Sequence, residues 1–240
     1  FSFFINNSYI WSYYKELYKP EFYQMAKLFT FQMCEKLVMD HGAIESLPLL
    51  VKKLEAQKPL IITDPGLVKA GIMQTVIDLL YQNHIFPAQF TEVEADPSLE
   101  IVSEALDIAK SNSADLIVGL GGGSALDIAK IVAVLMKNDD PLESYIGIDN
   151  IPAAGLPTIM IPTTAGTGSE VTPIVVLSDK KEHLKKGIVS DYLYPSVALV
   201  DPDLTISLPP HITAYTGIDA LTHAIEAYTN KFAHPFVDTF

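Results

Sequence analysis

The sequence predicts an α/β fold with a mainly parallel sheet, followed by the first part of an all-helical domain. Short apolar runs alternate with longer segments whose apolar residues recur every three or four positions, which is typical of parallel strands joined by crossover helices. From Pro210 onward the pattern is helical only. We therefore expect the sheet domain to span residues 25–208 and the helical domain to begin at residue 209 and to be incomplete at residue 240.

The individual elements follow from this alternation. The predicted strands are Leu60–Thr63, Ala88–Val93, Leu116–Leu120, Thr158–Ile161, Pro173–Leu177 and Ser196–Val200. The predicted helices are Leu67–Asn83, Ser98–Lys110 and Ala125–Met136, with Thr216–Tyr228 in the second domain. Residues 1–24 form an atypical extension crowded with aromatic side chains. This extension is either an arm that packs on the body or upstream sequence before a start at Met25, and we favour the second.

Composition restricts the class of protein. The formal net charge of -13 disfavours nucleic acid and anionic membranes as partners, because binding to phosphates needs clustered Lys and Arg. A single cysteine, Cys34, cannot form an internal disulfide and suits a reducing compartment. No apolar run approaches the roughly 20 residues of a membrane span. We expect a soluble, cytoplasmic protein.

A glycine turn, Gly121-Gly122-Gly123, connects the predicted strand Leu116–Leu120 to a helix. Consecutive glycines allow positive φ angles and the close approach of a ligand. We expect Ser124 to cap the helix and Asp127 to complete a capping-box-like pair. The free N–H groups at such a helix start could bind a pyrophosphate. The alternative is a tight turn without a ligand, since the segment matches neither the dinucleotide fingerprint nor a P-loop.

Three segments together resemble the iron-containing (group III) alcohol dehydrogenases. They are Gly121–Lys130 (GGGSALDIAK), Pro162–Thr172 (PTTAGTGSEVT) and Gly217–Glu226 (GIDALTHAIE), in the order and spacing of that family. The resemblance implies a Rossmann-like, NAD-binding domain followed by a metal-binding helical domain. It also implies a set of cofactor-binding residues: Gly121, Gly122, Gly123 and Ser124 at the pyrophosphate, Asp127 near the nicotinamide end, Thr163, Thr164 and Thr167 as donors, and Lys185. Without the resemblance, the threonine segment is simply a polar turn and Lys185 belongs to a solvated charge run.

Asp64 ends the predicted strand Leu60–Thr63 and matches the family position that binds the adenosine ribose. A carboxylate there would repel the 2′-phosphate of NADP, so the resemblance implies a preference for NAD. Asp64 can also cap a helix that has Pro65 at its first position, and the two roles are compatible. Asp96, before Pro97, can cap the next helix in the same way.

Asp219 and His223 stand four residues apart, so both side chains project from one face of a helix. Alone, such a pair is more often a surface ion pair. The resemblance implies instead that they are the first two ligands of a catalytic Fe2+, or of Zn2+, whose complete set is one aspartate and three histidines. The other two histidines would fall beyond Phe240, so we expect these 240 residues to hold the metal poorly.

The resemblance implies oxidation of a primary alcohol or diol by NAD, or reduction of the aldehyde, with the metal as Lewis acid. It does not identify the substrate, and the protein could form a homodimer. Two alternatives stay open. One is a relative of glycerol dehydrogenase or dehydroquinate synthase, and the other is a catalytically silent nucleotide-binding fragment.

Overall fold

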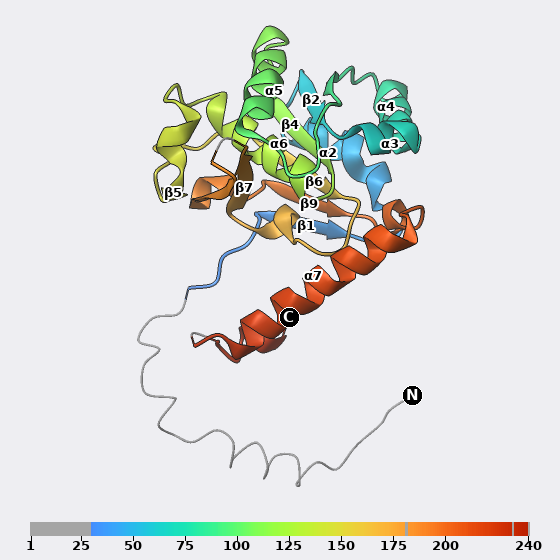
Figure 1. Cartoon of the computed structure of the whole chain (residues 1–240). Helices are drawn as coiled ribbons and strands as arrows, with labels where there is room; N and C mark the ends of the chain where they lie inside the picture. The colour runs from blue at the N-terminus through green and yellow to red at the C-terminus, as the bar shows by residue number, and fades with distance from the viewer. Residues whose placement is uncertain (1–29, 181, 232, 240) are drawn as a thin grey trace, which may run out of the picture. The chain divides into compact units, whose positions relative to one another are not determined.

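The computed structural model describes residues 30–240 except 181, 232 and 240, so the predicted extension of residues 1–24 lies outside the described residues. Its centre is a six-stranded sheet in which every pair of neighbours is parallel, in the order β1-β9-β6-β4-β2-β3 (Figure 1). The strands are β1 (Lys36–Met39), β2 (Pro59–Ile62), β3 (Ala88–Phe90), β4 (Leu116–Gly121), β6 (Thr158–Pro162) and β9 (Val197–Val200). The predicted α/β class with a mainly parallel sheet is confirmed.

Helices cover both faces of this sheet, so its central strands are buried on both sides and read as continuous apolar runs. Successive residues of a strand point to opposite faces. In β2, Leu60 and Ile62 pack with α5 (Leu99–Ser111) and α6 (Gly123–Leu135), whereas Ile61 packs with the helices of the other face. The helices of that other face are α2 (Leu47–Lys53), α3 (Pro65–Lys69) and α4 (Ile72–Gln82).

A second, three-stranded sheet has the order β5-β8-β7 and packs against α6 through β7. Its strands are β5 (Gly147–Ile148), β7 (Ile174–Asp179) and β8 (Leu184–Val189). The predicted strand Pro173–Leu177 is therefore a strand, but it belongs to this small sheet, where it pairs antiparallel with β8. The antiparallel pair of β7 and β8 brings the chain after β6 back onto α6, next to the predicted cofactor site.

Some elements differ from the sequence-based expectation. The predicted helix Leu67–Asn83 is divided into α3 and α4 because Gly71, with φ 79°, adopts a left-handed conformation that no helix continues through. Strand β1 and helix α2 were not predicted. The connections also contain short 3-10 turns: η2 (Ala43–Ser46), η3 (Leu142–Tyr145), η4 (Ser169–Val171), η5 (Asp191–Leu193), η6 (Pro202–Thr205) and η7 (Val237–Thr239).

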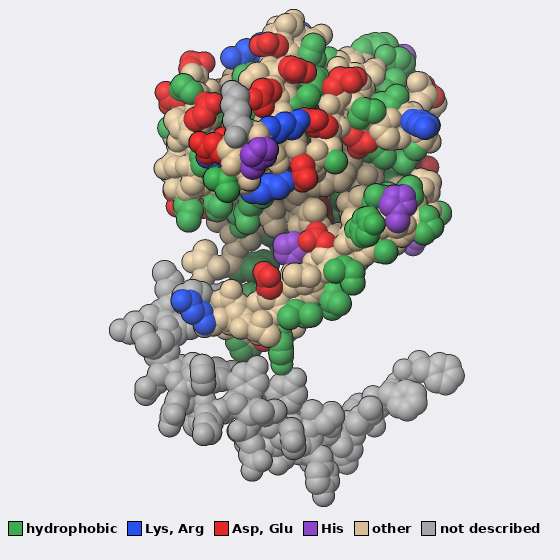
Figure 2. Space-filling view, in the orientation of Figure 1, with side chains coloured by type: hydrophobic (Ala, Val, Ile, Leu, Met, Phe, Trp, Pro, Cys, Tyr) green, Lys and Arg blue, Asp and Glu red, His purple; other side chains and the backbone are tan. Residues whose placement is uncertain are grey.

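The last helix, α7 (Pro210–Thr229), begins earlier than predicted, with proline in its first turn. It has no buried residue, and several of its large apolar side chains are exposed, among them Tyr215, Ile218 and Leu221. Figure 2 shows hydrophobic side chains along this helix, and acidic side chains scattered over the visible face of the rest of the molecule. Over the described part of the chain, no helix combines the length and the apolar character needed to cross a bilayer.

Candidate functional site

The predicted cofactor segments meet at one edge of the large sheet. Asp64 follows β2, Gly121 ends β4 and Thr163 follows β6, and these three strands are adjacent and parallel. Their carboxyl ends therefore lie side by side at the same edge. In open α/β sheets, ligands bind at this edge. The site is thus assembled from Asp64, Gly121 and Thr163, which lie about 40 to 60 residues apart in the sequence.

The glycine turn is tightly packed, which explains two of its glycines. Gly121 has φ 151°, and a Cβ there would lie 2.8 Å from the Ala125 Cβ and 3.3 Å from Asp64 Oδ2. A Cβ on Gly123 would lie 2.8 Å from Thr167 Cγ2. Real Cβ atoms essentially never approach a neighbour as closely as 2.8 Å. The turn therefore needs glycine at both positions to hold its place between Asp64 and Thr167.

The expectation that Ser124 caps the helix is wrong. The backbone is still extended at Gly122, which is the N-cap of α6, so the helix starts at Gly123 and Ser124 already lies in its first turn. No side chain caps this end of α6, and Asp127 forms no capping box. The first N–H groups of a helix have no partner within the helix. Without a side-chain cap, this N-terminus is suited to binding an anion.

Asp64 caps α3, as the sequence predicts. Its Oδ1 accepts hydrogen bonds from the N–H groups of Gly66 (2.8 Å) and Leu67 (3.1 Å), and Pro65 occupies the first turn. The second oxygen, Oδ2, lies on the side of Gly121. The cap fixes the carboxylate beside the glycine turn, and its other predicted role, at the adenosine ribose, stays a prediction.

The threonine loop, residues 163–168, faces the glycine turn. The Thr163 N–H donates to the Gly121 carbonyl (2.9 Å), which continues the pairing of β4 and β6 by one residue. Further on, Thr164 lies next to Gly122 and Thr167 next to Gly123. The three predicted threonines are therefore brought together with the glycines.

The Asp127 carboxylate lies between Ser169, which directly follows this loop, and β7. Its Oδ1 accepts the Ser169 hydroxyl at 2.5 Å, and its Oδ2 accepts the Val176 N–H at 2.9 Å. Lys130, one turn along α6, lies 3.4 Å from Oδ1. Asp127 thus connects α6 with both the end of the threonine loop and β7.

Lys130 is a buried cation that the sequence analysis left without a role. Its side chain is 1% exposed, and its ammonium donates to the carbonyls of Ser169 (3.0 Å), Thr172 (3.3 Å) and Ile174 (2.5 Å). Burial lowers the pKa of Lys130, and Asp127 partly offsets that effect. Burial raises the pKa of the nearby Glu170, while Lys130 acts in the opposite direction. The signal in the sequence was a charged pair three residues apart in an otherwise apolar helix.

Lys185 lies away from these contacts. It is on β8, where its ammonium pairs with Asp96 (2.5 Å) and donates to the Ser178 hydroxyl (2.9 Å). Neither partner belongs to the glycine turn or the threonine loop. The expectation that Asp96 caps the following helix is wrong, because Ser98 is the N-cap of α5 and Asp96 has a positive φ of 54°.

Asp219 and His223 lie on one face of α7, with Asp219 Oδ1 3.6 Å from His223 Nε2. Both side chains are partly exposed. Within the described ranges, no group of three or more His, Cys, Asp or Glu residues could hold a metal ion. One carboxylate and one imidazole on the same face fit part of an iron or zinc site, but two ligands do not complete one.

Helix α7 reaches the threonine loop just before these two residues. A Cβ on Gly166 would lie 2.8 Å from the Thr216 carbonyl oxygen, so the loop backbone packs directly on the helix backbone. Asp219 follows Thr216 by three residues. The helix that carries the predicted metal ligands therefore packs on the same loop that faces the glycine turn.

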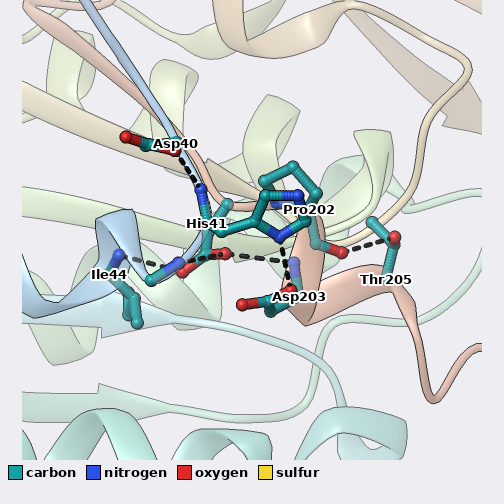
Figure 3. A network of polar contacts seen from close by, with 8 residues as sticks. Asp40, His41, Ile44, Pro202, Asp203 and Thr205 are labelled. Carbon is teal, nitrogen blue, oxygen red and sulfur yellow. Dashed lines mark hydrogen bonds and ion pairs between the residues drawn. The ribbon is translucent and has the colours of Figure 1, made fainter.

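A second polar cluster occupies the carboxyl ends of β1 and β9 (Figure 3). Buried Asp201 accepts the N–H groups of Gly42 and Ile44, and His41 Nδ1 lies 2.8 Å from Asp203 Oδ1. The hydrogen bond with Asp203 raises the pKa of His41. These contacts connect the turn after β1 to η6 and have a structural role.

Comparison with known proteins identifies the family. The family model described as iron-containing alcohol dehydrogenase matches residues 34–202. Long-chain-alcohol dehydrogenase 1 of Geobacillus thermodenitrificans is 48% identical over 200 residues, which cover 82% of this chain and 50% of that protein. The structure of a 1,3-propanediol oxidoreductase superposes with a TM-score of 0.85 at 35% identity, covering 89% of this chain and 56% of that one.

A sulfoacetaldehyde reductase from Bifidobacterium kashiwanohense, solved in complex with NAD+, superposes with a TM-score of 0.81 at 34% identity, covering 89% of this chain and 57% of that one. The chain spans about half the length of the curated relatives it matches. The family match includes the large sheet, the glycine turn and the threonine loop. The chain therefore belongs to the iron-containing alcohol dehydrogenase family.

Proposed function

We propose that this chain is the nucleotide-binding part of an NAD-dependent alcohol dehydrogenase that uses a divalent metal to interconvert a primary alcohol or diol and the aldehyde. The observation that carries the proposal is the position of the glycine turn. It lies at the uncapped N-terminus of α6, between the Asp64 carboxylate and the threonine loop. A dinucleotide needs an anion site flanked by a ribose acceptor, and this edge of the sheet offers both.

In this proposal, the residues along the edge bind successive parts of NAD. Gly121, Gly122, Gly123 and Ser124 hold the pyrophosphate through backbone N–H groups and the dipole of α6. Asp64 accepts hydrogen bonds from the adenosine ribose through Oδ2, since Oδ1 is engaged in the cap. The threonine loop then lies on the side of the nicotinamide, because β6 follows β4 in the sheet.

Asp219 and His223 supply the metal ligands of α7, together with residues of the whole protein that the described part of this chain does not provide. When bound, a divalent iron or zinc ion would supply Lewis-acid chemistry at the alcohol oxygen, and NAD would be the hydride acceptor. The role of this chain is to orient the cofactor and to hold α7 against the threonine loop through Gly166.

The relatives differ in the substrates that their names print, which include a long-chain alcohol, 1,3-propanediol and sulfoacetaldehyde. These names do not narrow the substrate, and our expectation of a small alcohol or aldehyde stays a proposal. Cys34 is buried and has no cysteine partner, which fits a reducing compartment such as the cytoplasm. A homodimer stays our expectation for its assembly, and light scattering after size-exclusion chromatography tests it.

The test is a titration of the 240-residue chain with NADH and with NADPH, followed by nicotinamide fluorescence. Circular dichroism first establishes that the chain is folded. We expect NADH to bind more tightly than NADPH, and we expect no alcohol oxidation by this chain alone because its described residues provide only two metal ligands. A folded chain that binds neither nucleotide contradicts the proposal.

A second candidate is a catalytically silent nucleotide-binding module. The observation that favours it is that no group of three or more metal-ligating side chains occurs in the part of the chain that the structure describes. This candidate also predicts NADH binding without turnover. The two differ when the helical domain is restored, because only the dehydrogenase then oxidises alcohols with added metal.

A further inference from the structure

We propose that Asp127 and Lys130 are positioning residues: they fix the threonine loop against the glycine turn through Ser169, and neither touches the cofactor. The inference rests on the proposed NAD site. It changes the role that the family resemblance implies for Asp127, from a contact near the nicotinamide to an internal support. It also gives a role to the buried Lys130.

Both oxygens of the Asp127 carboxylate already accept hydrogen bonds within the protein. One oxygen accepts the Ser169 hydroxyl and faces the Lys130 ammonium, and the other accepts a backbone N–H of β7. The side chain is 12% exposed. Oδ2 can accept one more hydrogen bond, but the burial of the side chain leaves a bound nucleotide little access to it.

All three N–H groups of the Lys130 ammonium have acceptors within the protein. An ammonium carries three N–H groups, and three carbonyl oxygens of the segment 169–174 lie at 2.5–3.3 Å from it. A lysine that bound phosphate would need a free donor at the surface. Because the side chain is 1% exposed, this lysine serves the protein backbone.

The threonine loop is short and is fixed on both sides. The threonine loop is fixed at its start by the bond from the Thr163 N–H to the Gly121 carbonyl. It is fixed after its end by Ser169, which binds Asp127 through its hydroxyl and Lys130 through its carbonyl. Only residues 164–168 lie between the two anchors, and they carry the side chains that face Gly122 and Gly123. Releasing the second anchor frees the loop and adds an entropic cost to nucleotide binding.

The order of strands decides which part of the nucleotide should be affected. Asp64 and the glycine turn, on β2 and β4, are not held by Lys130, whereas the threonine loop follows β6. ADP should need only Asp64 and the glycine turn for binding. NADH should need Asp64, the glycine turn and the threonine loop. The ratio of NADH to ADP affinity therefore reports the position of the loop.

The experiment compares Ser169→Ala and Lys130→Met with the wild-type 240-residue chain, and Lys137→Met serves as the matched control. Lys137 lies just after α6, and it is exposed where Lys130 is buried. We measure the dissociation constants of NADH and ADP and the unfolding temperature of each protein. We expect Ser169→Ala and Lys130→Met to weaken NADH binding about tenfold while ADP binding changes less than about twofold. Lys137→Met should change neither.

Several outcomes overturn the inference. Unchanged NADH affinity in Ser169→Ala overturns it, and so does a parallel loss of NADH and ADP affinity, which indicates a general structural defect. If Lys130→Met does not fold, Ser169→Ala, which removes one hydroxyl, decides alone. If Asp127→Asn weakens NADH binding but Ser169→Ala does not, Asp127 contacts the cofactor directly. A folded wild-type chain that binds no NADH overturns the proposed function together with the inference, whereas variant affinities equal to wild type overturn only the inference.

Discussion

Replacing Gly121 by alanine tests the geometry of the glycine turn most directly. Gly121 ends β4 with φ 151°, a conformation that residues with a side chain rarely adopt. A Cβ added there would lie 2.8 Å from the Ala125 Cβ, which is attached to the backbone of α6 and cannot rotate away. We expect this substitution to destabilise the fold and to weaken NADH binding together.

The size of the effect follows from two costs. An unfavourable backbone conformation costs about 1–3 kcal/mol, and overpacking a rigid contact costs about 1–3 kcal/mol more. Alanine also restricts the unfolded chain, which returns about 0.4–1 kcal/mol. The net loss is about 1–5.5 kcal/mol out of the roughly 5–15 kcal/mol of a typical domain. The unfolding temperature should therefore fall by about 2–22 °C for a chain of this size.

The assay is urea unfolding followed by circular dichroism, with NADH affinity measured on the folded proteins. Gly187→Ala is the matched control, because a Cβ on this β8 glycine meets nothing within 4 Å and its φ is not in the positive range. It should change stability by less than about 0.5 kcal/mol. The double variant Gly121→Ala/Ala125→Gly removes the steric contact and keeps the backbone strain, so it should recover part of the loss. Equal stability of Gly121→Ala and Gly187→Ala would refute the reasoning.

Three further predictions concern charge. Asp64→Asn should raise the affinity for NADPH relative to NADH at least about tenfold, because asparagine no longer repels a phosphate. It should leave the free energy of unfolding within about 0.5 kcal/mol of the wild-type value, because asparagine still caps α3. An unchanged affinity ratio contradicts the ribose assignment. The hydrogen bond with Asp203 raises the pKa of His41 above the ordinary histidine value of 6.5, so this pair contributes its full stability below pH 6.5 and loses it as the pH rises through the higher pKa of the folded state. Asp203→Asn should therefore lower the His41 pKa measured by NMR, and an unchanged value refutes the pairing. Added Zn2+ should change the unfolding temperatures of wild type and of His223→Ala equally, since two ligands do not form a stable site. A rise in the unfolding temperature of wild type alone indicates a more complete metal site.

Burial explains why the sequence predicts strand β4, helix α6 and the turn between them. Strand β4 and helix α6 are buried on all sides, so the apolar pattern is dense and the glycines between them mark the turn. Strand β1 was missed because it is a four-residue edge strand with an exposed pattern, which weakens the periodic signal. Strand β8 was missed because its lysines, among them Lys185, resemble a solvated charge run, and in the fold they do lie at the surface of a small sheet.

For the site, local chemistry was predictable and long-range contacts were not. The cap by Asp64 is a contact between neighbours and could be read from Asp64-Pro65. The start of α6 was misplaced because Gly122 caps without a side chain, whereas sequence patterns favour Ser124. The contacts of Lys130 with carbonyls 39 to 44 residues away depend on the return of the chain from β6 to β7 over α6. No spacing rule encodes that return.

The order of these contacts across the sheet explains how one chain can bring the proposed cofactor site and the proposed metal helix to the same loop. Moving from β2 through β4 to β6, the carboxyl edge presents the Asp64 carboxylate, the glycine turn and the threonine loop. At Gly166 the threonine loop meets the backbone of α7, three residues before Asp219. Directly after the same loop, the Ser169 carbonyl accepts a hydrogen bond from the Lys130 ammonium. A displacement of the loop would therefore move both the surface that faces the glycine turn and the support of the proposed metal helix. The proposed anchoring by Ser169 and Lys130 therefore matters for both proposed sites, because an error in the position of the loop would displace the cofactor site and the metal helix together.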